Sequence, residues 1–382
     1  MRTLFLRSLG LSIAWVGATI GASIGLAACS GSSGGSGFNT PPGADGGPAN
    51  MDSGNNIPPG SDGMAPILNG DGSGGTDALT DGEVTTTVTV YANTDDTLYS
   101  LDPKTNALTM IGKFAGTGDA SNNSTITDCA VNAAGEVYVN SETVVFKAAL
   151  PASPGGAVNL TQVATIAVAS GQKFYALAFV PTGVLGSGEA LIGGDDKGEL
   201  WSIDTTGGAT KDLGNFGPDP NAATPSIFAL SGDVVFYMDA NNKPTGLATI
   251  RSCTTGTYPK CVTTNDYLAG IDMTALAAAY NGSKGASLLL GIYGGMGASN
   301  HGVGNGTGYG DLFGLGAWEG NVYAFQRATK TNGPQLISIN ATTGVGMVIP
   351  TPTVTFTMGG WSGAGVTTKT VITVPPPPPP PK

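Results

Sequence analysis

The chain has 382 residues, of which 61 are glycine and only 11% are charged, and its formal net charge at pH 7 is −11. Short runs of Val, Thr, Ile, Leu and aromatic residues alternate with turn residues, which favours an all-β protein over a helical one. No basic patch is present to neutralise phosphates. The composition therefore argues against nucleic acid as a partner and against electrostatic docking on anionic lipid.

The first residues have the layout of an export signal. Arg2 and Arg7 precede an uncharged apolar stretch, residues 9–24, and small residues then lead to Cys29. A positive start, an apolar middle and a small-residue cleavage site are the features of a secretory signal peptide. An ordinary signal peptide with an incidental cysteine and an uncleaved membrane helix are the alternatives to the interpretation that follows.

The residues from Leu26 to Cys29 read Leu-Ala-Ala-Cys, which resembles the lipobox of bacterial lipoproteins. The resemblance implies that residues 1–28 are removed as a signal peptide and that lipid attached to Cys29 is the protein's contact with a membrane. By the same resemblance, Ser30 implies sorting to an outer membrane, at its periplasmic face or at the cell surface. The expected location is thus the cell envelope.

Two segments lack the apolar residues that a folded core needs. Residues 29–84 hold the cysteine and a Gly/Ser/Pro/Asp-rich stretch, and residues 375–382 are seven prolines and a lysine. The first cannot bury enough surface to offset the entropy cost of ordering, so we predict a disordered tether. The second predicts a short polyproline II tail. Residues 85–374 remain as the folded domain.

A hairpin pattern recurs within this domain. Residues 97–102, 199–204 and 335–340 read Thr-Leu-Tyr-Ser-Leu-Asp, Glu-Leu-Trp-Ser-Ile-Asp and Gln-Leu-Ile-Ser-Ile-Asn. Each segment alternates large apolar with small polar side chains, as a half-buried strand does, and each is followed by a turn and a second strand. Residues 273–280 instead read as a helical turn.

Apolar strands rich in small residues begin near residues 126, 174, 226, 267, 311 and 360. A spacing of about 40–50 residues is the period of a four-stranded β-propeller blade, whose innermost strand favours small residues. Residues 86–112 contain three strands of a unit, and 360–365 contain a lone first strand. We therefore predict an all-β propeller of about six blades closed by both termini; five or seven blades are the alternatives.

The repeats resemble those of the NHL, YVTN and quinoprotein-type propeller superfamily. This resemblance covers most of the folded domain, and it implies an architecture without implying an activity.

Three cysteines lie in the folded domain. Cys253 and Cys261 enclose seven residues at an expected hairpin of an exported protein, which predicts a local disulfide. Cys129 lies on a predicted inner strand with apolar neighbours. We expect a buried free thiol at this position and not a reactive nucleophile.

A glycine-rich stretch, residues 294–311, contains the only histidine of the chain. One interpretation is a flexible surface insertion. The other is a loop that lines a pocket at the propeller axis, with Asn300, His301, Tyr309 and Asp311 as contacts, because loops on rigid scaffolds often carry function. A single histidine without a Cys-x-x-Cys pair excludes the usual zinc motifs. We expect no metal site and no cofactor.

The acidic pairs Asp95-Asp96 and Asp195-Asp196 each precede one of the repeated strands. Equivalent turns of different blades lie far apart, which argues against a glycosidase pair, and aspartate is favoured in turns because it accepts from local backbone N–H groups. We expect turn chemistry at both places.

The folded domain has neither the Gly-Lys-Ser/Thr motif of phosphate-binding loops nor a Gly-x-Ser-x-Gly elbow. We therefore expect a membrane-anchored binding or scaffold propeller without enzymatic activity, with a protein or glycan ligand. The alternative is a propeller enzyme, a lyase or quinone-dependent oxidoreductase, with its site at the central channel. A purely structural surface protein is a third hypothesis. The sequence does not indicate an oligomeric state.

Overall fold

The computed structural model describes residues 89–116, 125–166, 171–254, 261, 265–293, 308–318, 321–328, 333–341, 343–350, 359–369 and 371–372. The predicted signal peptide, tether and polyproline tail lie outside these residues. So do Asn300 and His301 of the glycine-rich stretch. Among the residues described, no helix combines the length and the apolar character that crossing a membrane requires.

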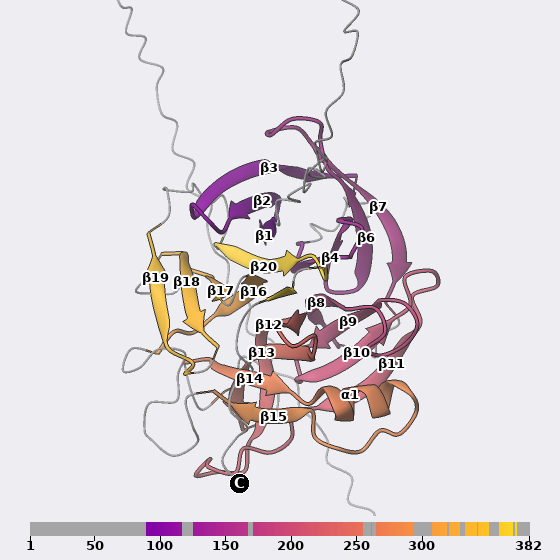
Figure 1. Cartoon of the computed structure of the whole chain (residues 1–382), viewed down its shortest axis with the longest axis vertical. Coiled ribbons are helices and arrows are strands. Elements are labelled where there is room, and N and C mark those ends of the chain that lie inside the picture. Colours follow the sequence, from indigo (N-terminus) through magenta and orange to yellow (C-terminus); the bar gives the residue numbers. More distant parts are fainter. Residues whose placement is uncertain are drawn as a thin grey trace, which may run out of the picture. The chain divides into compact units, whose positions relative to one another are not determined.

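The described strands form five four-stranded antiparallel units, which we call blades 1 to 5 (Figure 1). Blade 1 consists of β20 (Trp361–Val366), β1 (Val90–Thr94), β2 (Thr97–Asp102) and β3 (Ala107–Ala115). Blade 2 consists of β4 (Asp128–Val131), β5 (Val137–Asn140), β6 (Val144–Ala149) and β7 (Val158–Thr165). Blade 3 consists of β8 (Phe174–Val180), β9 (Ala190–Asp195), β10 (Glu199–Ile203) and β11 (Thr210–Asn215).

Blade 4 consists of β12 (Ile227–Asp239), β13 (Pro244–Cys253), β14 (Tyr267–Ile271) and β15 (Leu289–Ile292). It also carries the helix α1 (Met273–Tyr280) and a short parallel strand, β21 (Val371–Ile372), beside β12. Blade 5 consists of β16 (Leu312–Trp318), β17 (Asn321–Gln326), β18 (Gln335–Asn340) and β19 (Gly346–Ile349). The outer strands β3 and β7 pair in parallel, so blades 1 and 2 share an eight-stranded sheet.

The first strands of the five blades lie around a common axis. In order around this axis, β4 contacts β8, β8 contacts β12, β12 contacts β16, β16 contacts β20, and β20 contacts β4. Figure 1 shows these strands at the centre, with the outer strands of each blade at the rim. The described residues thus form an all-β, β-propeller-like arrangement.

Strand β20, near the end of the chain, pairs with β1, the first described strand. The pairing is antiparallel and places Val90 opposite Val366 and Ala92 opposite Ala364. The ring of Trp361 packs edge-on against that of Tyr99, with 5.3 Å between their centroids. Residues 86–112 and 360–365 were expected to share one unit. Their described strands lie in one sheet.

The predicted number of about six blades is not confirmed, because one predicted first strand lies elsewhere. The segment near residue 267 is β14, the third strand of blade 4. Strands β12 and β13 are 13 and 10 residues long, so this blade occupies more of the chain than the others. The small apolar residues of β14 pack near α1, where Ala269 and Ile271 share a buried cluster with Leu276. Its composition reflects this packing and not a place at the axis.

The helical turn predicted for residues 273–280 is α1. Asp272 caps it, because its side chain accepts hydrogen bonds from the backbone N–H groups of Thr274 and Ala275. The helix buries Leu276 and Ala279 in the cluster between blades 3 and 4. It is the one helix of the described residues, and its last residue, Tyr280, lines a groove described below.

Candidate functional site

Two aspartates meet at the propeller axis. Asp128 begins β4, Asp233 lies within β12, and both side chains are completely buried and hydrogen-bonded to each other. Asp128 accepts from the backbone N–H groups of Ala364 at 3.0 Å and Leu177 at 2.6 Å. Asp233 accepts from the N–H group of Leu315 at 2.6 Å. The pair therefore contacts β4, β8, β12, β16 and β20.

Burial raises the pKa of both carboxyl groups. For Asp128 the charge of Asp233 adds to the effect of burial. For Asp233 burial is the largest effect and raises the pKa to about 8. The hydrogen bonds from Asp128 and from backbone N–H groups lower this pKa, but they do not cancel the effect of burial. Two carboxylates that share one dry site cannot both ionise cheaply, so this environment favours the protonated form of the pair.

The donors around the pair do not suit a metal ion. Backbone N–H groups point at both oxygens of Asp128 and both oxygens of Asp233. The partly positive hydrogens of these N–H groups would repel a cation. They also bind the carboxylate oxygens that a metal ion would need as ligands. Across the part of the chain that is described, no three His, Cys, Asp or Glu side chains are grouped as metal ligands would be.

The hollow that the described first strands enclose at the axis is small. The hollow between the first strands has a volume of about 10 Å³, and its lining includes Ala130, Leu177, Val235, Leu315 and Ala364. This is about the space that one water molecule occupies. A substrate of ordinary size does not fit there.

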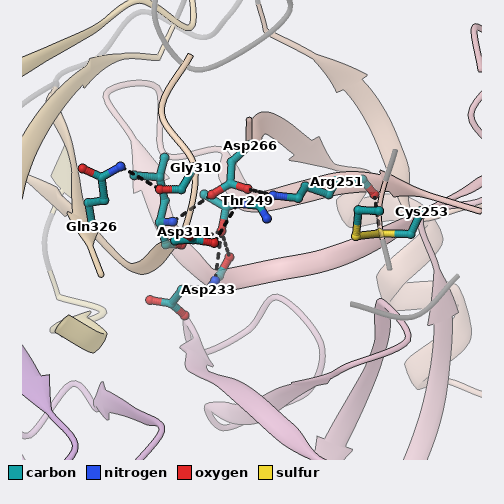
Figure 2. Close-up of polar contacts among 10 residues, drawn as sticks. Asp233, Thr249, Arg251, Cys253, Asp266, Gly310, Asp311 and Gln326 are labelled. Atoms are coloured by element: carbon teal, nitrogen blue, oxygen red, sulfur yellow. Dashed lines mark hydrogen bonds and ion pairs between the residues drawn. A yellow bond between two sulfur atoms is a disulfide. The ribbon is translucent and has the colours of Figure 1, made fainter. Parts of the chain in front are cut away.

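Arg251, on β13, connects blades 4 and 5 where the first strands begin (Figure 2). Its Nε lies 2.6 Å from Asp266 Oδ1, and its Nη2 lies 3.0 Å from Asp311 Oδ1. The second oxygen of Asp266 accepts the N–H of Leu312 at 2.8 Å. The side chains of Arg251 and Asp266 are 8% and 0% exposed, whereas that of Asp311 is 31% exposed. Burial raises the pKa of Asp266, and the charge of Arg251 opposes this rise.

Thr249 links this cluster to the axis. The N–H of Asp233 donates to Thr249 Oγ1 at 3.0 Å, and this hydroxyl donates to the carbonyl oxygen of Leu312 at 3.1 Å (Figure 2). Gln326 donates to the carbonyl oxygen of Gly310 at 2.8 Å in the same region. Arg251, Thr249 and Asp266 thus bond blade 4 to blade 5, whereas the contact of Gln326 with Gly310 lies within blade 5.

Arg327 makes the equivalent connection between blades 5 and 1. Its two terminal nitrogens lie 3.2 and 3.0 Å from the two carboxylate oxygens of Asp95, and Nη1 lies 3.1 Å from Ser362 Oγ. The guanidinium carbon lies 5.5 Å from the centre of the Phe313 ring. Both arginines are therefore neutralised by carboxylates of the fold, which leaves them poorly suited to act as catalytic groups.

Two of the four residues predicted to line an axial pocket can be placed. Asp311 binds Arg251, and the carbonyl oxygen of Tyr309 accepts the N–H of Asp266 at 2.8 Å. Both lie at the boundary of blades 4 and 5, and neither contributes to the lining of the axial hollow. Asn300 and His301 lie outside the described residues, so their role stays a prediction.

The acidic turns differ from each other. Asp195 accepts the N–H groups of Lys197 and Glu199 at 3.0 and 2.8 Å, which is the expected turn chemistry. Asp96 likewise accepts from Thr97 Oγ1 at 2.8 Å within its turn. Asp95, by contrast, binds Arg327 of another blade, an interaction that the sequence pattern did not indicate.

The expected disulfide joins Cys253 and Cys261. Cys253 follows Arg251 closely on β13, and the disulfide lies beside the Arg251 cluster in Figure 2. Cys129 is a buried free thiol, and burial raises its pKa, with the neighbouring charges of Asp128 and Asp233 adding to the effect. It therefore stays a neutral, unreactive thiol at neutral pH.

A larger hollow lies where β8 ends and β9 begins, and we call it the blade 3 groove. The Arg251 cluster, by contrast, lies where first strands begin. The volume of the blade 3 groove is about 400 Å³. Apolar side chains and polar side chains both line it: Phe179, Ala190, Leu191, Ile203, Ala209, Glu189, Ser202, Asp204, Thr205, Thr210, Lys211 and Tyr280.

Several polar groups of the blade 3 groove are held in place by the fold. Glu189 accepts the N–H of Ala133 at 3.0 Å and the hydroxyl of Thr368. Lys211 Nζ donates to the carbonyl oxygen of Tyr280 at 2.5 Å and lies 6.0 Å from the centre of the Tyr280 ring. An ammonium has three donors, so this lysine can also donate to a ligand.

Asp204 supplies a second carboxylate to the blade 3 groove. Hydrogen bonds from the side chain and backbone of Thr206 lower its pKa, so it is ionised at neutral pH. The groove thus combines two acids, one ammonium, hydroxyls and two aromatic rings in a volume typical of small-ligand sites. No pattern in the sequence indicated this groove, because its residues come from four strands, the residues next to them and a helix.

The axial pair did leave a signal in the sequence. Asp128 and Asp233 each interrupt an otherwise apolar or small-residue strand, at Thr-Asp-Cys-Ala-Val and Gly-Asp-Val-Val-Phe. A carboxyl group in a buried strand needs partners, because burying it without them is costly. The pattern could have indicated a buried site, but it could not have indicated that the two residues meet.

No protein-family model matches the chain. No curated protein sequence matches it either. Among solved structures, the chain is similar to a protein of unknown function from Bacteroides caccae, with 10% identity, a TM-score of 0.36, and coverage of 73% of this chain and 98% of that one. It is similar to the Dos1 propeller, with 13% identity, a TM-score of 0.31, and coverage of 72% of this chain and 58% of that one. It is also similar to BamB from Moraxella catarrhalis, with 12% identity, a TM-score of 0.24, and coverage of 67% and 70%. Because these TM-scores are low, we base the propeller-like assignment on the strand order and contacts of this chain.

Proposed function

We propose that the chain is a lipid-anchored envelope protein whose five-bladed propeller, closed by the pairing of β20 with β1, binds a glycan in the blade 3 groove without turning it over. The observation that carries the proposal is the contrast between the two hollows. The hollow that the described residues line at the axis has a volume of about 10 Å³, and the blade 3 groove has a volume of about 400 Å³. A propeller enzyme with its site at the axis needs an open channel mouth, whereas a binding protein needs only a hollow at its surface.

The chemistry of the blade 3 groove favours a sugar over other small ligands. A pyranose ring presents C–H groups on its faces and hydroxyl groups around its edge. The partly exposed Tyr280 ring supplies apolar surface for a face, and Phe179 and Leu191, which are 9% and 3% exposed, add a small apolar area. Glu189 and Lys211 supply an acceptor and a donor for the hydroxyls. The groove therefore fits a neutral or amino sugar better than a strongly anionic ligand.

Binding is tested by titrating the purified chain with N-acetylglucosamine, glucose and short oligomers of each. We expect saturable binding, followed by calorimetry or by saturation-transfer NMR. Tyr280→Ala and Lys211→Met should each weaken it by about tenfold or more, which corresponds to about 1.4 kcal/mol. Lys104 lies 5.9 Å from the centre of the Trp318 ring, so Lys104→Met is a matched control that should bind as the wild type does.

Two results would contradict this proposal. One is the absence of saturable binding to every sugar in the series, and the other is binding that neither groove variant weakens. The same samples are monitored for released sugar. Product formed with turnover would support the alternative of a propeller enzyme.

The anchor is tested by growing cells with labelled palmitate. We expect label on the wild-type chain and none on Cys29→Ala, because the thiol of Cys29 is the proposed attachment point. Cys129→Ala should be labelled like the wild type, since Cys129 is buried in the fold. Equal labelling of the wild type and Cys29→Ala would refute the lipobox interpretation.

A further inference from the structure

We propose that Asp128 and Asp233 form a proton-holding latch that ties the first strands of all five blades together at the axis, so that the stability of the ring falls as the pH rises. Neither Asp128 nor Asp233 lines the blade 3 groove, so the latch does not depend on a ligand there. These two residues have no part in the proposed binding function.

The geometry of the pair requires a proton. The two carboxyl groups hydrogen-bond to each other, and two carboxylates have no donor to share. Their remaining positions face backbone N–H groups, at 2.6 Å from Leu177 and 2.6 Å from Leu315, which can only donate. A proton held between the carboxyls is therefore the one group that satisfies the contact between them.

The latch spans the ring because each carboxyl reaches beyond its own blade. Asp128 of blade 2 accepts from β8 of blade 3 and from β20 of blade 1. Asp233 of blade 4 accepts from β16 of blade 5. The bond between the two carboxyls joins these two groups of strands across the axis. Loss of the shared proton would place two negative charges in contact at the point where all five blades meet.

The described strands packed against the pair supply no cation that is free to stabilise that charge. The strands packed against it carry these titratable side chains: Tyr91, Cys129, Tyr138, Tyr175, Asp195, Tyr237, Asp239 and Arg251. Arg251 is the only cation among them, and Asp266 and Asp311 neutralise it. Burial raises the pKa of Cys129, so this thiol is neutral at neutral pH.

The direction of the pH dependence follows from the raised pKa values. In the unfolded chain both carboxyls ionise near pH 4. In the folded chain burial raises the pKa of both, that of Asp233 to about 8. Between about pH 4 and pH 8 the folded state therefore binds more protons than the unfolded state, and its stability decreases as the pH rises. The stabilising effect of the raised pKa values is fully present below about pH 4.

The test compares denaturant unfolding of the wild type, Asp128→Asn and Asp233→Asn between about pH 5 and pH 7.5. For each proton that the folded pair retains, the unfolding constant should rise about tenfold per pH unit. Each variant lacks one carboxyl group, so the rise of its unfolding constant per pH unit should be about tenfold smaller than in the wild type. This expected difference does not depend on how stable the variant is at any single pH. Asp102→Asn, at the last residue of β2 and away from the axis, makes the same chemical change and should keep the wild-type dependence.

A second measurement decides the matter if the variants do not fold. Carbon-13 NMR of the wild type, labelled at the aspartate carboxyl carbons, should show a protonated carboxyl assigned to Asp128 or Asp233 near pH 7. Two ionised carboxylates at that pH would overturn the proposal. Folded variants with the same pH dependence as the wild type would overturn it as well.

Discussion

Replacing Arg251 by alanine is expected to lower the free energy of unfolding by about 3–5 kcal/mol at neutral pH. The change removes the cation 2.6 Å from Asp266, whose side chain is 0% exposed. Removing one partner of a buried ion pair leaves the other charge in a poorly solvated place, and that cost exceeds the value of the pair itself. Chemical denaturation at pH 7 measures the loss.

The pH at which this loss is measured should change its size. Burial raises the pKa of Asp266, and Arg251 opposes the rise. Without Arg251 the pKa of Asp266 should rise further, so acid neutralises the stranded carboxylate in the folded variant. The loss should therefore shrink as the pH falls from 7 towards about 4.5. A loss that grows on acidification would contradict this account of the Arg251 cluster.

Lys147→Ala is the control for Arg251→Ala. Lys147 pairs with Glu136 at 2.6 Å, but both side chains are 40% exposed or more, at 45% and 40%. Solvent screens such pairs, so this variant should lose much less stability than Arg251→Ala does. If the two variants lost the same stability, burial would not be what makes the Arg251 cluster important.

Replacing Gly363 by alanine is expected to destabilise the domain by at least about 3 kcal/mol. Gly363 lies on β20, where an added Cβ would come within 2.1 Å of Asp128 Oδ1 and 2.4 Å of Asp128 Cα. The second atom belongs to the backbone of β4, so no side-chain rotation relieves the overlap. Blade 1 would have to move away from blade 2, and the hydrogen bond from Ala364 to Asp128 would lengthen. The unfolding midpoint in denaturant measures the effect.

Gly188→Ala is the matched control for Gly363→Ala. A Cβ at Gly188 would meet no atom within 4 Å, and its backbone does not need a positive φ. This change should leave the stability unchanged or raise it slightly, because alanine has less freedom in the unfolded chain. Equal unfolding midpoints for the two variants would show that β20 and β4 do not approach as closely as described.

The hairpins and the helix were predictable because their signals are local. Residues 97–102 and 335–340 alternate apolar and polar side chains, and they form β2 and β18 with the predicted bounds. Residues 273–280 form α1 as predicted. Each of these patterns depends on which face of one element is buried, and neighbouring residues in the chain determine that.

The number of blades was not predictable in the same way. The small apolar residues of Tyr267–Ile271 match those of a first strand, yet they form β14 and pack near α1. A run of small buried residues indicates close packing without indicating what it packs against. The length of the β12–β13 hairpin decided the place of β14, and the pairing of those two strands is visible only in the folded chain.

The sequence by itself determined the export signal pattern, the β hairpins, the helix and the cysteine pair, because each depends on residues close together in the chain. The tertiary structure alone decided that Asp128 meets Asp233, that Arg327 binds Asp95, and that the blade 3 groove has more room than the axis. These features depend on which side chains the ring of blades brings together from distant strands. No periodicity along the chain records such a meeting, since it is set by packing between blades.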